Sequence, residues 1–269
     1  MSVYIMTHKK FDQPNIDGYK TLLVGAYKGH VFGDFFDDAG DNISEKNPFY
    51  CELTGLYWLW KHIDDDYVGI VHYRRYFSKS VSRKKILSEK DIKKKMLKAD
   101  IIVPNKVNLF KSVESQFAAT YKNDPELLML IRNSVKANYP DYLSAYDKVM
   151  KGSEIYFCNM MICSKLLYQQ YCSWLFTILF DIEKNVDMTG YSDYQKRLYG
   201  FISERLLTVW IEKNRLKVCE LGMVNIDSND GKKKELLKGL RRVYSFYFPE
   251  NNAVNRIIDV VRKKQIFNN

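Results

Sequence analysis

The segment 67–77, YVGIVHYRRYF, constrains the fold more than any other part of the chain. Its first five residues, YVGIV, are apolar or aromatic at every position, so a strand made from them must be covered on both faces. The next six residues include one histidine and two adjacent arginines, whose charge is costly to bury unless an anion or carboxylates meet it. The segment therefore predicts a layered α/β protein in which a central strand ends at an anion-binding site.

Strands and helices alternate through the first hundred residues. Strand patterns lie at 2–7, 19–26 and 100–103, a polar loop lies at 34–47, and a basic amphipathic helix lies at 88–98. A further helix is predicted to begin at Asn47, with this asparagine as N-cap and Pro48 at the first helical position. This alternation predicts an α/β fold, a Rossmann-like mixed sheet flanked by helices.

The second half of the chain is richer in helices. Helical patterns are predicted over 113–150, 165–184 and 195–213, and strand patterns at 154–163 and 217–224. Because no internal repeat or low-complexity linker appears, we expect one domain over 1–231 followed by a basic C-terminal extension over 232–269. Between residues 232 and 264 the extension carries ten Lys and Arg residues against three Asp and Glu residues.

Composition is that of a folded protein without a membrane span. The 269 residues are 46% hydrophobic, enough for a substantial core. The start of the chain lacks the apolar run of a signal peptide, and the longest apolar stretch, 171–182, is shorter than the ~20 residues that cross a bilayer. The five cysteines form no CxxC pair and are expected to be reduced thiols. We therefore expect a cytoplasmic protein.

Common catalytic motifs are absent from the sequence. It contains no GxxxxGK[ST], GxGxxG, HExxH or GxSxG motif and no Cys/His spacing typical of a metal site. Ligands of open α/β sheets bind beyond the carboxyl ends of the strands, which is where His72, Tyr73, Arg74 and Arg75 lie. The planar guanidinium group of arginine can donate two parallel hydrogen bonds to two phosphate oxygens, so these residues predict a phosphate site. The alternative is that Arg74 and Arg75 pair with the acidic residues 64–66 or with other acids.

Two neighbouring segments extend this candidate site. Thr7, His8 and Lys9 end the first strand and are expected at the same edge of the sheet, unless they form an ordinary surface turn. Polar residues of the loop before the next helix could hold hydroxyl or phosphate groups; these are Asp41, Asn42 and Asn47. Their alternative role is turn and capping chemistry.

Two later residues are candidates for contact with substrate. Asn159 interrupts the apolar segment IYFCNMMIC, and a buried amide there needs a partner, either in the core or on a ligand. Glu204 lies near the start of an apolar helix and is a candidate general base. Its alternative is an exposed glutamate paired with Arg197 or Arg205.

Taken together, the segments GDNISEKNPFYCELTGLYWLWK, DYVGIVHYRRYF, ADIIVP, YFCNMMICSK and GFISERLLTVW resemble domain-of-unknown-function family 4422. That family is found in bacterial capsule, exopolysaccharide and O-antigen gene clusters and is regarded as glycosyltransferases, with members similar to galactofuranosyltransferases. The resemblance covers residues 3 to about 225. It implies a GT-A-like fold, and a hexosyltransferase that uses UDP-galactofuranose or another UDP-hexose such as UDP-galactopyranose or UDP-glucose.

The resemblance also implies roles for the candidate residues. The strand that carries a metal-binding Asp-x-Asp in GT-A enzymes carries His-Tyr-Arg-Arg here, so we expect no metal and no cofactor, with the arginines and His72 stabilising the diphosphate. We expect an inverting reaction with Glu204 as general base, or Asp193 as second choice. The nucleotide would contact Thr7, His8, Lys9, Tyr73, Arg74, Arg75, Asp41, Asn42 and Asn47, and the sugars would contact Asn159, Arg197 and Glu52.

The basic extension 232–269 is predicted to bind a membrane surface or protein. Acceptors in such pathways are glycans on lipid carriers, and the apolar and basic residues of 232–269 are typical of a segment that binds the inner face of the cell membrane. Alternatively, this segment packs on the domain or on a second subunit in a homodimer. A nucleic-acid-binding protein is disfavoured because the chain lacks an RNA-binding signature. A non-catalytic protein that binds sugar nucleotides stays open.

Overall fold

The computed structural model describes residues 1–29, 32–80, 85–122 and 124–226. The predicted extension 232–269 lies outside the described residues. The strands of this part of the chain are β1 (Ser2–Thr7), β2 (Tyr19–Leu23), β3 (Phe35–Phe36), β4 (Tyr67–His72), β5 (Arg75–Ser80), β6 (Lys85–Ile86), β7 (Ile101–Pro104), β8 (Val107–Asn108), β9 (Glu154–Ile155), β10 (Met161–Ser164), β11 (Val218–Leu221) and β12 (Met223–Asn225).

The main sheet is mixed, as the sequence predicts. Its strands follow the order β11-β7-β10-β4-β1-β2-β3. β1 runs parallel to β2 and β4, whereas β10 runs antiparallel to β4 and β7. Because β1 and β4 are parallel, with Met6 beside His72, the segments that follow both strands leave the sheet at the same edge.

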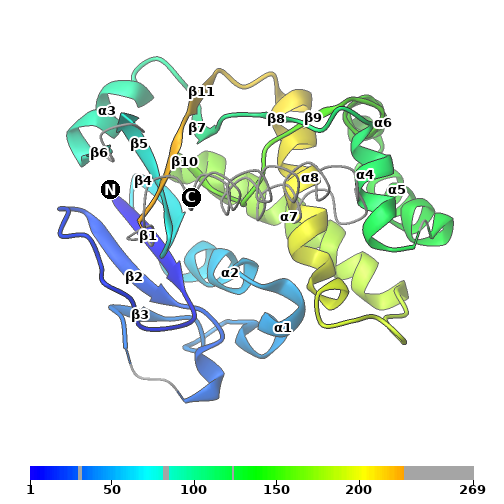
Figure 1. Cartoon of the computed structure of the whole chain (residues 1–269), viewed down its shortest axis with the longest axis horizontal. Helices are drawn as coiled ribbons and strands as arrows, with labels where there is room; N and C mark the ends of the chain where they lie inside the picture. The colour runs from blue at the N-terminus through cyan, green and yellow to red at the C-terminus, as the bar shows by residue number, and fades with distance from the viewer. Residues whose placement is uncertain (30–31, 81–84, 123, 227–269) are drawn as a thin grey trace, which may run out of the picture.

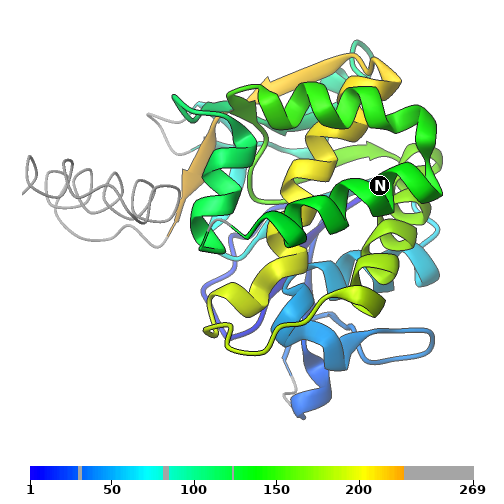
Figure 2. The ribbon, with the colours of Figure 1, turned by 90° about the vertical axis from the view of Figure 1, so that its right-hand side faces the viewer.

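Helices cover the sheet and form a second layer beside it. They are α1 (Asn47–Tyr50), α2 (Leu53–His62), α3 (Glu89–Met96), α4 (Val113–Thr120), α5 (Pro125–Asn138), α6 (Leu143–Lys151), α7 (Lys165–Asn185) and α8 (Leu198–Asn214), with 3-10 turns η1 (Ala26–Lys28), η2 (Ser44–Lys46), η3 (Pro140–Tyr142) and η4 (Gln195–Arg197). α7 packs against β4 and β10, and α2 packs against α7. Helices α4, α5, α6 and α8 gather on the side away from β1–β3, the side that faces the viewer in Figure 2 (Figures 1 and 2).

Local packing explains the position of α2. A Cβ atom on Gly55 would lie 2.6 Å from the Sδ of Met6 and 2.7 Å from a methyl of Val24. The helix therefore approaches β1 more closely than any side chain at this position would allow, and glycine is required for packing. No helix among the described residues is long and apolar enough to cross a membrane.

Three local predictions are wrong in their details. The helix predicted from Asn47 is two helices, because the chain bends at Cys51 with φ 53°, and Asn47 is the first residue of α1 rather than its N-cap. The predicted strand 154–163 is interrupted by a loop between β9 and β10, in which Cys158 and Asn159 have φ 77° and 48°. The last predicted strand divides into β11 and β12, which pair with different neighbours.

Candidate active site

A cavity of about 450 Å³ opens at the edge of the sheet where β1 and β4 end. Its walls come from the strand ends, from the α1–α2 junction, from the loop before β10 and from the start of α8. The lining residues are Met6, His8, Val24, Asn47, Pro48, Cys51, Glu52, His72, Tyr73, Arg74, Arg75, Cys158, Arg197, Gly200, Phe201 and Glu204. The cavity thus lies at the strand ends, where the sequence predicts a ligand site.

The basic segment after β4 is a tight hairpin. His72 pairs with Arg75 across β4 and β5, so Tyr73 and Arg74 form the turn between them. The Tyr73 ring lies 5.3 Å from the His8 ring, 5.3 Å from the Nζ of Lys9 and 4.8 Å from the guanidinium carbon of Arg74. Basic side chains from the ends of two strands therefore collect around one aromatic ring at the cavity rim.

The predicted alternative, in which acids 64–66 neutralise the arginines, does not fit the geometry. Asp64 pairs with Lys165, and Asp65 lies 3.3 Å from the N-terminal amine and accepts a hydrogen bond from Tyr4. These acids precede β4, whereas the arginines follow it, and a six-residue strand spans roughly 20 Å. The arginines at the cavity therefore lie at the other end of β4 from this acidic segment.

His72 is bound to the loop before β10. Its Nε2 lies 2.6 Å from the carbonyl oxygen of Cys158, and since a carbonyl only accepts, this nitrogen must carry a proton. Burial lowers the pKa of His72 below its ordinary value, although the charge of Glu52 opposes the shift. A lowered pKa favours the neutral ring, and the cationic role of His72 at the diphosphate stays a prediction.

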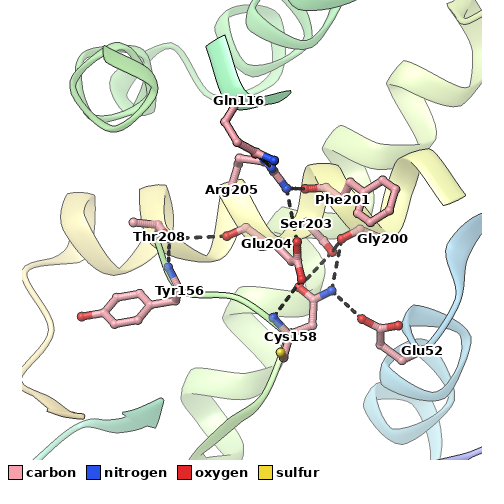
Figure 3. Close-up of polar contacts among 11 residues, drawn as sticks. Glu52, Gln116, Tyr156, Cys158, Gly200, Phe201, Ser203, Glu204, Arg205 and Thr208 are labelled. Atoms are coloured by element: carbon pink, nitrogen blue, oxygen red, sulfur yellow. Dashed lines mark hydrogen bonds and ion pairs between the residues drawn. The ribbon is translucent and has the colours of Figure 1, made fainter. Parts of the chain in front are cut away.

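Glu204 is buried rather than exposed. Its carboxylate accepts a hydrogen bond of 2.8 Å from the backbone N–H of Cys158 and lies 3.2 Å from the Arg205 guanidinium (Figure 3). Burial raises the pKa of Glu204 to about 7, and the charge of Arg205 only partly offsets this. The predicted alternative was right about the Arg205 pairing but wrong about exposure, since only 5% of Glu204 is accessible.

Arg205 is itself fixed by several groups. Its guanidinium donates to the carbonyl of Phe201 and to the side chain of Gln116, and it lies 5.0 Å from the Phe117 ring. The Glu204–Arg205 pair therefore sits in a prepared site between α8 and α4, with Glu204 on the side that lines the cavity.

Glu52 and Asn159 form a second buried contact. The Nδ2 of Asn159 donates to Oε1 of Glu52 at 2.8 Å and to the carbonyl of Gly200 at 3.2 Å. Asn159 is fully buried, and its Oδ1 accepts from Ser203. Asn159 is absent from the cavity lining, so the structure places it behind Glu52, and the core alternative describes it better than a direct substrate contact.

Thiols meet two of the arginines at the cavity. The Nε of Arg197 lies 3.2 Å from the Cys51 sulfur, and the Nη1 of Arg75 lies 3.6 Å from the Cys158 sulfur. All five cysteines are free, as predicted. Burial raises the pKa of Cys51 to about 11, so its thiol stays protonated and acts as a weak hydrogen-bond acceptor.

Besides Asn159, five predicted site residues are absent from the cavity lining. Asp193 is fully exposed and pairs with Lys196 at 3.5 Å. Asp41 accepts from the hydroxyl of Tyr57 on α2, whereas Asn42 donates to the carbonyl groups of Asp38 and Gly40 and so fits the turn alternative. Thr7 donates to the carbonyl of Lys9, and the Nζ of Lys9 lies 5.3 Å from the centre of the Tyr73 ring.

Sequence reasoning missed the contribution of apolar and thiol side chains. Pro48, Cys51, Cys158, Gly200 and Phe201 line the cavity, yet their neighbours in sequence are those of core residues. No local signal marks them, because the bends at Cys51 and Cys158 depend on contacts with distant segments. Among the described residues, no group of three or more His, Cys, Asp or Glu side chains is arranged to hold a metal ion.

The fold resembles that of a solved glycosyltransferase. The chain matches the apo structure of the bifunctional glycosyltransferase WbbM with a TM-score of 0.78 and 32% identity, over 85% of this chain and 45% of WbbM. The chain thus corresponds to less than half of that larger protein. The molecule is a mixed α/β protein of glycosyltransferase-like fold, as the sequence predicts.

The chain belongs to the family described as Domain of unknown function (DUF4422), which matches residues 2–215. The family resemblance found in the sequence is therefore confirmed. None of the curated proteins matches the chain.

Proposed function

We propose that the chain is a glycosyltransferase that moves galactofuranose from UDP-galactofuranose onto a hydroxyl of a lipid-linked glycan, in the synthesis of a bacterial capsule, exopolysaccharide or O-antigen. The observation that carries this proposal is the pairing, in one cavity, of a buried carboxylate with several guanidinium groups. Glu204 lines one wall, and Arg74, Arg75 and Arg197 line others. The similarity to WbbM supports the reaction class.

The cationic rim suits a sugar nucleotide diphosphate. As the bond between the anomeric carbon and the phosphate oxygen breaks, its electron pair goes to UDP, which gains negative charge. Arg74 and Arg75 provide fixed positive charge at the carboxyl ends of β4 and β1, where ligands of α/β sheets bind. Tyr73 orders the rim by holding Arg74 and His8 on its ring.

Glu204 suits the role of general base. An acceptor hydroxyl attacks the anomeric carbon, a new C–O bond forms, and the hydroxyl proton passes to a carboxylate. A base works best when its pKa is close to the working pH, and burial raises the pKa of Glu204 to about 7. The hydrogen bond from Cys158 keeps the carboxylate in place on the cavity wall.

We propose that these arginines replace a metal ion. In metal-dependent enzymes a divalent cation neutralises the leaving diphosphate, and the guanidinium groups can do this directly. Arg197, half-buried beside the Phe201 ring at 5.5 Å, extends the cationic wall toward the start of α8, where we place the acceptor sugar.

A donor assay tests the proposal. The full chain is incubated with UDP-galactofuranose, UDP-galactopyranose or UDP-glucose and a short glycan acceptor on a lipid carrier, and release of UDP and formation of product are measured. We expect the fastest turnover with UDP-galactofuranose and no effect of EDTA. Absence of turnover with all three donors, together with absence of UDP binding by calorimetry, would contradict the proposal.

Two further outcomes would revise its parts. Turnover that EDTA abolishes and Mn²⁺ restores would contradict the metal-free mechanism. Binding of UDP without turnover of any donor would favour the non-catalytic sugar-nucleotide-binding alternative. The predicted association of 232–269 with the membrane stays a prediction, and unchanged binding of liposomes after deletion of this segment would refute it.

A further inference from the structure

Two adjacent residues beside the cavity have an unusual backbone conformation. Cys158 and Asn159 both lie in the left-handed region, with φ 77° and 48°, although neither is glycine. Cys158 is only 5% exposed and Asn159 is fully buried. Non-glycine residues persist in this region only when the surrounding contacts determine the conformation, and such positions cluster at functional sites. The contacts that hold Cys158 and Asn159 in this conformation therefore point to a functional role of the loop before β10.

Cys158 and Asn159 bind two carboxylates, Glu204 and Glu52, that both line the cavity. On one side, the N–H of Cys158 donates to Oε1 of Glu204 at 2.8 Å. On the other side, the Nδ2 of Asn159 donates to Oε1 of Glu52 at 2.8 Å. In Figure 3 the carboxylates of Glu52 and Glu204 lie on either side of this loop, one from the α1–α2 junction and one from α8.

The orientation of the Asn159 amide follows from its partners. An ionised carboxylate only accepts hydrogen bonds, so the NH₂ group must face Glu52. The Oδ1 then faces the hydroxyl of Ser203, at 2.9 Å. This arrangement uses Oε1 of Glu52 and leaves its Oε2 without a hydrogen-bond partner among the described residues, on a half-buried side chain that lines the cavity.

We propose that Glu52 is a second catalytic carboxylate and that Asn159 is the positioning residue that holds its free oxygen toward the cavity. This inference rests on the proposed glycosyl transfer. When the bond from the anomeric carbon to UDP breaks, the carbon gains positive charge before the acceptor oxygen has bonded to it. The carboxylate of Glu52 stabilises that positive charge, while Glu204 takes the proton of the acceptor hydroxyl.

The charges around Glu204 support a division of labour between the two acids. The charge of Glu52 is one of the causes that raise the pKa of Glu204, alongside the larger effect of burial. Arg205 and Arg75 act in the opposite direction, as does the N–H of Cys158. A neighbouring charge that makes Glu204 easier to protonate fits its proposed role as the residue that takes the proton.

A double substitution that moves the negative charge from position 52 to position 159 tests the role of Glu52. In E52Q/N159D the glutamine amide can donate to the aspartate, so the hydrogen bond between 52 and 159 is kept while the negative charge moves from 52 to 159; the bond from 159 to the Gly200 carbonyl is lost. Aspartate tolerates the left-handed conformation, as asparagine does. We expect E52Q alone to lower kcat about 100-fold with little change in UDP affinity, and the double variant not to restore kcat. Glu154→Gln, at an exposed position of β9, is the matched control.

The position of Asn159 is tested by Asn159→Asp alone. A second negative charge beside Glu52 should raise the pKa of Glu204 further, because like charges disfavour ionisation. We therefore expect lower kcat, unchanged KM for the donor and an acid limb of the pH–rate profile that moves to higher pH. A variant with the wild-type kcat but a lowered melting temperature would show a purely structural role for Asn159 and overturn the positioning role.

The outcomes separate the two proposals. If the wild type releases no UDP from any donor, the proposed function falls, and the inference about Glu52 falls with it. If the wild type turns over while E52Q keeps its kcat, or if the double variant E52Q/N159D restores kcat to the wild-type value, only the catalytic role of Glu52 is overturned. A kcat about 100-fold lower in both variants, with retained UDP binding, supports it.

Discussion

The imidazole of His72 donates a hydrogen bond of 2.6 Å to the carbonyl oxygen of Cys158, and so connects the end of β4 to the strained loop before β10. The same loop residue donates its N–H to Glu204. The backbone of Cys158 thus joins a neutral histidine on one side to a carboxylate on the other. The strand that ends in basic residues and the helix that carries the proposed base are therefore held in one arrangement.

Removal of the His72 ring should affect stability and turnover more than UDP binding. His72→Leu leaves a buried carbonyl of Cys158 without its donor, which costs about 1–3 kcal/mol of the free energy of unfolding. His72→Gln, whose amide can donate, should lose less. Urea unfolding measures the stability of each variant, and calorimetry measures its affinity for UDP. A UDP affinity that falls tenfold in both variants would instead show a direct role at the diphosphate.

The pH dependence of turnover should report Glu204. A general base must be deprotonated, and burial raises the pKa of this carboxyl to about 7, so kcat/KM should rise with pH through about 7 and then level off. Glu204→Gln should lower kcat roughly 10²–10⁴-fold, the usual contribution of general-base catalysis. If the Glu204→Gln variant kept the wild-type pH profile, the rise of kcat/KM with pH would report another group.

The same shift predicts how stability depends on pH. Because the pKa of Glu204 is higher in the folded state than the 4.5 of an unperturbed glutamate, the folded state binds the proton more tightly, and this contribution to stability is lost as pH rises from about 4.5 to 7. The Glu204→Gln variant has no carboxyl group at this position, so its stability does not fall with pH for this reason. Relative to the wild type, the variant should therefore gain up to about 3 kcal/mol over this range, measured by urea unfolding at several pH values.

Much of the sheet could be predicted because its strands are short apolar runs. The segments of β1, β4 and β7 are each apolar enough to be buried on both faces, and the observed strands lie within about two residues of the predicted ones. The rule that ligands bind at the carboxyl ends of strands then placed His8 and the 72–75 segment at the cavity.

The rest of the site could not be predicted because it depends on contacts between distant segments. The bend at Cys51 and the corner at Cys158 interrupt patterns that read as a continuous helix and a continuous strand. The sequence left open whether Glu204 faces the cleft or is exposed, since its burial depends on Arg205 and the distant Gln116. Asp193 shows the converse error, because a carboxylate close in sequence to the site is fully exposed.

Gly55 provides a test of the packing that places α2 and the α1–α2 junction. In Gly55→Ala the new methyl would meet Met6 and Val24 at less than 3 Å, so the helix must move away from the sheet. We expect a loss of about 1–3 kcal/mol in the free energy of unfolding, typical of an overpacked core. Calorimetric unfolding measures this. A variant as stable as the wild type would mean that α2 can shift freely, and Glu52 with it.

The arginines of the cavity should each contribute to UDP affinity. A hydrogen bond between charged groups contributes about 1.5–3 kcal/mol, so Arg74→Ala and Arg75→Ala should each weaken UDP binding roughly 10- to 100-fold, as measured by calorimetry. Arg75→Lys should recover only part of this, because an ammonium group lacks the planar fork that binds phosphate oxygens in pairs. Lys94→Ala, an exposed position on α3, removes the same charge far from the proposed contacts and should leave the affinity unchanged.

The design of this comparison separates binding from folding. Arg75 is exposed and Arg74 is half-buried, so neither alanine variant creates a large cavity in the core, and their melting temperatures should stay close to that of the wild type. If Arg75→Ala unfolded the protein, its contact with the Cys158 sulfur would be the main role of this arginine. If both variants folded and bound UDP as tightly as Lys94→Ala, the diphosphate would have to lie elsewhere in the cavity, and Arg197 would become the first residue to test.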